Sequence, residues 1–179
     1  MRKITAADGL SVVSMMSAWE QETFELQQTI VSFGHDLFNV IPFQDSWTAG
    51  QVTEHLLKAE SGIPGILSGP TLPAERPPDE KMEAIGSIFL DFTTRLKSPE
   101  ALLPSADPKD QAALMGALIK NRAEIGKVAA VTNLSRRCML FPFPVLGTLT
   151  GFEWVYFAIC HSKRHHHQLN NIHRKLTAG

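Results

Sequence analysis

The sequence predicts an all-α fold, an antiparallel four-helix bundle with one additional helix and long connectors. Apolar residues recur at every third or fourth position along five segments, which is the spacing of an amphipathic helix and not of a strand. Proline-rich stretches separate several of these segments, and two segments begin with a capping box. No internal repeat interrupts the pattern, so we expect a single domain over residues 1–179.

The first helix is predicted from about Ser17 to Asn39. Its apolar residues lie three, four or seven positions apart: Trp19, Leu26, Ile30, Phe33, Leu37 and Val40. Pro42 should end this helix, because a proline disfavours helical backbone angles in the residue before it.

The second helix is predicted to start at Thr48. Thr48 and Gln51 have the spacing of a capping box, in which each side chain bonds to the backbone N–H of the other residue, and Trp47 can close over Val52. This start fixes the phase of the helix and places His55 beside an inward-facing seam, which contains Ala49, Val52, Leu56, Ala59 and Ile63. Pro64 should kink or end the helix.

Two further helices are predicted between proline-rich connectors. The stretch SGPTLPAERPPDE precedes a helix from about Asp79 to Leu96, whose apolar positions keep the helical period. SPEALLPSADP is another connector, after which Asp107 or Pro108 should open a helix that ends near Val131. The pattern does not decide which of these two helices belongs to the four-helix core.

The last helix is predicted to begin with a second capping box, Thr150 with Glu153. The preceding residues, 132–150, contain prolines and a glycine among apolar residues, so we expect an ordered loop; a short strand there would find no partner in the chain. Along the last helix His161 flanks an inward stripe with a heptad-like spacing, made of Val155, Ala158, Ser162, His165, Leu169, Ile172 and Leu176.

The composition excludes several classes of protein. Hydrophobic residues make up 44% of the chain and charged residues 20%, which is a globular and not a disordered balance. The net charge of −1 predicts no attraction to nucleic acid or to an anionic membrane, and no apolar run approaches the length of a membrane span. With two cysteines and no secretory signal, we expect a cytoplasmic protein.

Three histidines suggest a metal site. His161 and His165 are one helical turn apart, so both imidazoles can reach one ion, and His55 can supply a third ligand from a facing helix. Three histidines leave coordination positions open to water or substrate, as in catalytic zinc sites. The alternative for each residue is a partly buried imidazole with ordinary hydrogen bonds.

The absent motifs restrict the chemistry. Lys163 and Arg164 fill the interior of the histidine pair, so the glutamate base of an HExxH protease is missing. The glutamates of di-iron bundles are missing too, which favours a site with one metal ion. No phosphate-binding, dinucleotide-binding or GxSxG motif occurs. Cys160 precedes His161 and is expected to be a small buried hydrophobic residue.

Two segments resemble the DinB/YfiT-like superfamily. WTAGQVTEHLLKAE resembles its second-helix signature, and GTLTGFEWVYFAICHSKRHHHQLNNI resembles its last-helix signature. The resemblance implies a bundle, often dimeric, in which a divalent ion such as zinc or nickel is held by residues matching His55, His161 and His165. Gln168 matches the family's glutamine after the second histidine. The loop of residues 139–149 and the proline in the second helix depart from the family pattern and could line the cavity.

The resemblance also implies a function. Relatives include transferases and isomerases that use a low-molecular-weight thiol, and metal-dependent hydrolases; we therefore expect an enzyme whose metal ion activates a thiol or water towards a small-molecule substrate. No residue identifies itself as a general base. The alternative is a non-catalytic metal-binding or stress-associated helical-bundle protein. The family pattern has no DNA-reading element, so neither a nucleic acid nor a membrane is expected as a partner, whereas a second copy of the chain is.

Overall fold

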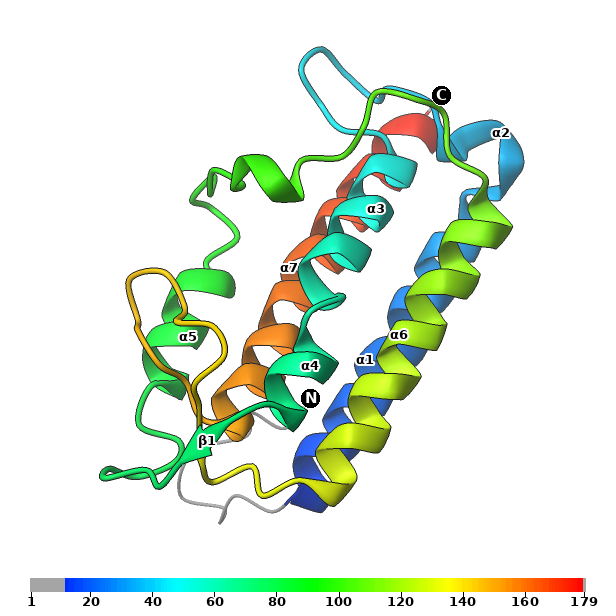
Figure 1. Cartoon of the computed structure of the whole chain (residues 1–179). Coiled ribbons are helices and arrows are strands. Elements are labelled where there is room, and N and C mark those ends of the chain that lie inside the picture. The colour runs from blue at the N-terminus through cyan, green and yellow to red at the C-terminus, as the bar shows by residue number, and fades with distance from the viewer. Residues whose placement is uncertain (1–11, 179) are drawn as a thin grey trace.

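The structure, a computed structural model, describes residues 12–178 and is mostly helical (Figure 1). This confirms the predicted helical class. The elements in chain order are α1 (Val12–Ser32), α2 (Gly34–Phe38), α3 (Ala49–Glu60), α4 (Ile63–Ser68), β1 (Thr71–Leu72), α5 (Met82–Phe89), the 3-10 helix η2 (Glu100–Leu102), α6 (Gln111–Val131), β2 (Arg137–Cys138) and α7 (Gly151–Thr177).

The long helices lie side by side (Figure 1). Helix α1 packs on both α6 and α7, and α3 also packs on α6 and α7. Helix α4 follows the direction of α3 and contacts α6, whereas α5 lies outside this group and packs on α7. The sequence pattern left open whether α5 or α6 belongs to the central group, and the contacts place α6 there.

The first predicted helix is wrong in its extent. It consists of two helices, because Gly34 has a φ of +58°, a left-handed conformation that ends α1 and that glycine adopts without a steric penalty. Helix α1 extends back to Val12, before the predicted start at Ser17. Val40 lies beyond α2 and is 39% exposed, so it does not belong to the buried stripe.

The predicted start of α3 is confirmed. The Thr48 hydroxyl accepts a hydrogen bond from the Gln51 backbone N–H at 3.1 Å, and the Gln51 side chain accepts one from the Thr48 N–H at 3.0 Å. The break near Pro64 is also confirmed, since α3 ends at Glu60 and Pro64 lies in the first turn of α4. One seam residue differs: Ala59 is only half-buried, and the neighbouring Glu60 is fully buried instead.

The predicted helix over residues 79–96 is wrong at both ends, because α5 spans only Met82–Phe89. Beyond it, the Asp91 carboxylate accepts a hydrogen bond from the Thr93 N–H at 3.0 Å, a local turn that competes with a helical backbone. Phe92 is therefore 44% exposed. Helix α6 starts later than predicted, at an N-cap formed by Asp110, and ends at Val131 as predicted.

The expectation that a strand within residues 132–150 would lack a partner is wrong. Strand β2 pairs antiparallel with β1, which lies in the proline-rich connector, and Thr71 faces Cys138 in the register. The Arg136 guanidinium also donates to the Thr71 hydroxyl at 2.7 Å. These contacts join the connector after α4 to the loop before α7.

The start of α7 is fixed by a buried capping box. The Glu153 carboxylate accepts from the Thr150 N–H at 2.8 Å, and the Glu153 N–H donates to the Thr150 hydroxyl at 3.2 Å. Glu153 is fully buried, and Arg76 compensates its charge through two hydrogen bonds of 2.6 and 2.7 Å. This second predicted capping box is confirmed, and it sets the rotational phase of α7.

The core consists of two hydrophobic clusters at successive levels of the long helices. One includes Trp19 and Ile125, and the other includes Leu26 and Leu118. The ion pair between Glu60 and Arg122 lies between the two clusters. Along the chain, Arg122 comes between Leu118 of one cluster and Ile125 of the other, and Glu60 likewise has members of both clusters on either side. Among the described helices, none is long and apolar enough to cross a membrane.

Candidate metal centre

The structure brings the three predicted histidines together. His55 comes from α3, about two turns after the Thr48 cap, and His161 and His165 come from α7, about three and four turns after the Thr150 cap. Because both caps form, both helices have a fixed phase and direct these side chains towards the α3–α7 contact. The relative exposures of His55, His161 and His165 are 3%, 6% and 8%.

The three Nε2 atoms converge. His161 Nε2 lies 3.3 Å from His55 Nε2 and 3.1 Å from His165 Nε2. At a zinc–nitrogen distance of about 2.0–2.1 Å, two corners of a tetrahedron are about 3.3 Å apart. The observed separations therefore suit three ligands of one small divalent ion.

Hydrogen bonds at the other ring nitrogens set the tautomers of two histidines. His55 Nδ1 lies 2.9 Å from the carbonyl oxygen of Leu102, and His165 Nδ1 lies 2.8 Å from the side-chain oxygen of Gln168. Carbonyl and amide oxygens only accept, so each Nδ1 must carry the proton and donate it. Both Nε2 atoms are then unprotonated, with a lone pair directed into the cluster.

His161 lies between these two lone pairs and does not satisfy both. A proton on its Nε2 would serve one neighbour and leave the other without a donor. Its Nδ1 is buried and has no hydrogen-bond partner among the described residues. The triad thus contains more buried acceptors than donors, and a bound cation would satisfy them together.

Burial keeps these ligands neutral. It lowers the pKa of His55, lowers the pKa of His165 to about 3 with a further contribution from the charge on His55, and lowers the pKa of His161 well below its usual range. Neutral imidazole is the form that binds metal. Protons therefore compete weakly with a metal ion at this site near neutral pH.

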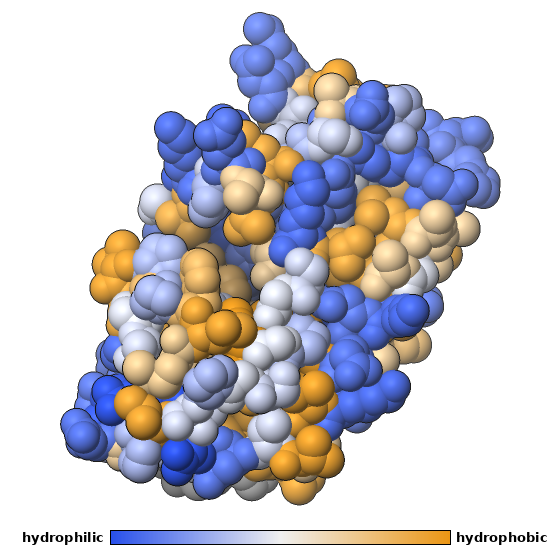
Figure 2. Space-filling view, in the orientation of Figure 1, coloured by the Kyte–Doolittle hydropathy of each residue, from blue (hydrophilic) through white to orange (hydrophobic). Residues whose placement is uncertain are grey.

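Aromatic rings enclose the triad. Phe157 stacks on His161 with ring centroids 5.3 Å apart, Phe89 meets the same ring edge-on at 5.7 Å, and Trp47 lies 5.2 Å from the His55 ring. Phe143, from the loop over residues 139–149, contacts both Phe89 and Phe157, so this loop supplies part of the wall. Figure 2 shows a hollow between α5 and the α3–α4 side of the molecule, with hydrophobic residues along its rim.

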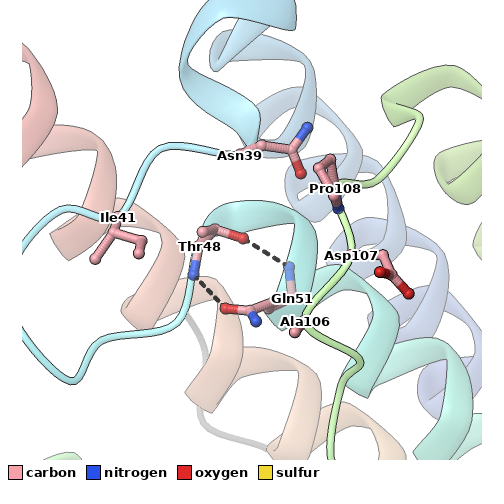
Figure 3. Close-up of a pocket in the computed structure, with 7 residues that line it drawn as sticks. All are labelled: Asn39, Ile41, Thr48, Gln51, Ala106, Asp107 and Pro108. Carbon is pink, nitrogen blue, oxygen red and sulfur yellow. Dashed lines mark hydrogen bonds between the residues drawn. The ribbon is translucent and has the colours of Figure 1, made fainter.

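A second depression lies at the start of α3 and lacks comparable chemistry (Figure 3). Three of its four polar side chains have partners: Thr48 and Gln51 bond to each other, and the Asn39 amide bonds to the backbone of Lys109 at 2.8 and 2.9 Å. The lining residues are Asn39, Ile41, Thr48, Gln51, Ala106, Asp107 and Pro108. This depression is therefore part of the capping structure and not a second candidate active site.

Sequence reasoning missed one contributor to the triad, the Leu102 carbonyl. It lies in η2, a turn inside a connector, and a backbone oxygen carries no signal of its role in the sequence. Cys160 was predicted to be a small buried hydrophobic residue, and this is confirmed by its exposure of 1%. Burial raises its pKa to about 11, which excludes a thiolate at neutral pH.

The fold and the triad define a class: helical proteins whose packed helices surround three histidines suited to a metal ion. The family model described as the DinB superfamily matches residues 18–169, and the chain belongs to this superfamily. The resemblance seen in the sequence is thereby confirmed.

One curated protein is similar to the chain over most of its length. The chain is 24% identical over 170 residues to the uncharacterized protein YuaE of Bacillus subtilis (strain 168), and the match covers 90% of this chain and 98% of that protein. No solved structure matches the chain significantly. The comparisons therefore give the family and no reaction.

Proposed function

We propose that the protein is a metal-dependent enzyme in which His55, His161 and His165 bind one divalent cation, zinc or nickel. The observation that carries the proposal is the convergence of three Nε2 atoms within 3.3 Å of their neighbours, two of them held as bare acceptors by hydrogen bonds at Nδ1. The group contains three buried imidazoles and, among the residues that the structure describes, no carboxylate, and such a donor set suits zinc or nickel better than magnesium or calcium.

A cation bound by three protein ligands would lower the pKa of a thiol or water in its open position and supply a nucleophile near neutral pH. Residues of this chain orient the histidines around that open position and keep water away from it. The Leu102 carbonyl and Gln168 fix the orientation of His55 and His165. Phe89 and Phe157 exclude bulk water from the His161 side, which strengthens electrostatic interactions inside the site.

We assign the enzyme to thiol-dependent group transfer or to hydrolysis, with a low-molecular-weight thiol or water as the activated ligand and a small molecule as the substrate. Both reactions begin with the same activation step. No described carboxylate contacts the triad, so we assign no general base.

The proposal also covers the arrangement of the helices, the oligomeric state and the location of the protein. We propose that α1, α3, α6 and α7 form the antiparallel four-helix bundle expected from the sequence, within a single domain over residues 1–179. We also propose a cytoplasmic homodimer with neither a nucleic acid nor a membrane as partner. The net charge of −1 supports the absence of a polyanionic partner.

The first experiment measures the metal content of the purified, untagged protein. We expect about one zinc or nickel ion per chain, and its loss from both His55→Ala and His161→Ala/His165→Ala, since the two imidazoles or the single imidazole that remain hold such ions much less tightly than three. His167→Ala is the matched control, because His167 lies on the same helix and stacks on Phe92 at 4.6 Å, away from the triad.

A retained ion in wild type and control, lost from both variants, would justify assays of thiol transfer and hydrolysis. A wild-type protein that neither contains a divalent ion nor binds one on titration at neutral pH would refute the proposal. An ion that is bound without any turnover across a panel of thiols and electrophiles would leave the non-catalytic alternative.

A further inference from the structure

A second group of metal-ligand side chains lies where α1 faces α7. It consists of Glu22 and Glu25 from α1 and His166 from α7, whose potential ligand atoms all lie within 4.8 Å of one another. His166 follows His165 directly but turns about 100° away from it around the helix axis, so it does not face the triad. The two groups therefore occupy different sides of α7.

Two of the three side chains in this group make hydrogen bonds to neutral hydroxyl groups. The Glu22 carboxylate accepts a hydrogen bond from the Ser162 hydroxyl at 2.9 Å and lies 3.5 Å from His166 Nδ1. His166 Nε2 lies 2.8 Å from the Thr29 hydroxyl. The Glu22 carboxylate of α1 and the His166 imidazole of α7 thus lie next to each other, and Thr29 contacts the other nitrogen of the same ring.

The charge of Glu22 is compensated within this group only when His166, whose Nδ1 lies 3.5 Å away, is protonated. This side chain is only 2% exposed, and Ser162, its hydrogen-bond donor among the described residues, is neutral. The buried Arg122 does not serve it, because its guanidinium makes two hydrogen bonds of 2.7 and 2.9 Å to Glu60. A buried carboxylate beside a neutral imidazole is costly, so in that state the group favours a positive charge beside Glu22.

Glu25 adds a second carboxylate to the group, which further favours a cation there. It lies one turn after Glu22 on α1, is half-buried, and accepts a hydrogen bond from the neutral amide of Gln21 at 2.9 Å. Two carboxylates on the same side of a helix, one turn apart, repel each other, and a divalent cation between them would reverse that effect. When His166 Nε2 donates to Thr29, its Nδ1 is unprotonated and offers a third ligand beside Glu22.

We propose that Glu22, Glu25 and His166 form a second divalent-cation site. Its donor set has two carboxylates and one imidazole, so it takes an oxygen-preferring ion of the manganese type, in contrast to the all-nitrogen triad. The ion joins α1 to α7 and stabilises the helix that carries His161 and His165. The second site does not depend on the proposed reaction at the triad.

The test titrates Mn²⁺ into the full-length protein after the triad has been filled with one equivalent of Zn²⁺. Loss of the free Mn²⁺ EPR signal reports binding. Glu25→Gln removes one carboxylate ligand, and Glu20→Gln is its matched control, because Glu20 is an exposed residue of the same helix. Changes to the outer partners of metal ligands already weaken binding by about 10- to 100-fold, so loss of a ligand should weaken Mn²⁺ binding by at least about tenfold.

A second pair of variants tests the imidazole. His166→Gln should weaken Mn²⁺ binding, whereas His167→Gln should not. The site is supported if zinc-filled protein binds about one Mn²⁺ and only Glu25→Gln and His166→Gln reduce its affinity. Failure of the zinc-filled protein to bind Mn²⁺ would overturn it, as would equal affinities in each variant and its control. The triple variant His55→Ala/His161→Ala/His165→Ala should still bind Mn²⁺, which separates this outcome from failure of the triad.

Discussion

The histidine triad and the Glu60–Arg122 pair are both buried polar clusters between the long helices, but they differ in how their hydrogen bonds are satisfied. Arg122 Nε and Nη2 donate to the two oxygens of Glu60 at 2.9 and 2.7 Å, and Nη1 donates to the Thr23 hydroxyl at 3.1 Å. The Trp19 ring lies 4.5 Å from the same guanidinium. In the triad, by contrast, buried acceptors outnumber donors.

This difference separates a cluster that is satisfied within the chain from one that could accept a ligand. The ion pair compensates its charges within the chain and needs no ligand, so we interpret it as a structural cluster that fixes how α1, α3 and α6 pack. The triad has unsatisfied buried acceptors, which is why we propose a bound cation there. Incomplete buried polar groups cost free energy in the folded protein, and they are kept where a ligand completes them.

The largest effect is expected from breaking the ion pair. Arg122→Met leaves the Glu60 carboxylate buried without a partner and should reduce the free energy of unfolding by about 3–5 kcal/mol. Adding Glu60→Leu removes the stranded charge and should restore much of the loss. Guanidinium unfolding of both variants measures this. A double variant as unstable as the single one would contradict a self-contained pair.

Removing the metal ion should have a smaller effect that is confined to the triad. If free metal is held at about 100 times its dissociation constant, binding stabilises the folded protein by about 2.7 kcal/mol. A chelator should therefore lower the melting temperature of wild type. With zinc as the added metal ion and no Mn²⁺ present, the variant His55→Ala/His161→Ala/His165→Ala should not be stabilised by zinc, and a zinc or chelator effect on that variant as large as in wild type would place the stabilising ion elsewhere.

Gln168→Leu tests whether the acceptor at His165 Nδ1 matters. Without it the ring is free to rotate or to change tautomer, and metal affinity should fall by about 10- to 100-fold. Gln168→Glu keeps an acceptor oxygen and should retain most of the affinity. Competition with a chromophoric chelator measures both variants. Equal affinities for Gln168→Leu and wild type would show that Gln168 does not orient the ligand.

Acid should destabilise the metal-free protein through the triad. Burial lowers the pKa of His165 to about 3, so between about pH 6.5 and 3 the unfolded chain binds a proton that the folded protein does not. Stability is therefore present above pH 6.5 and is lost as the pH falls. At pH 5.5 this residue alone should cost about 1.4 kcal/mol. Urea unfolding of wild type and His165→Ala at pH 7.5 and 5.5 measures the difference, which should be smaller in the variant.

Much of the site could be predicted, because residues close in sequence set the rotational phase of the two helices that carry the histidines. The two capping boxes, Thr48 with Gln51 and Thr150 with Glu153, define where α3 and α7 begin. From there the helical period alone directs His55 and His165 inward. Predictions without such a marker were less accurate: α1 is broken at Gly34, and α5 ends at Phe89, where the turn at Asp91 replaces the expected helix.

Caps and periodicity act over a few residues of one helix, so the linear chain was enough to predict the helical class and the three histidines, and two short segments carried the resemblance to the superfamily. Tertiary packing set the contacts between distant segments. It selected α6 as the partner of α1 and α3, paired β1 with β2, buried Glu60 against Arg122, and brought the Leu102 carbonyl to His55. Each of these contacts joins segments far apart in the chain, and a polar residue or backbone oxygen finds its partner only once packing has excluded water from both.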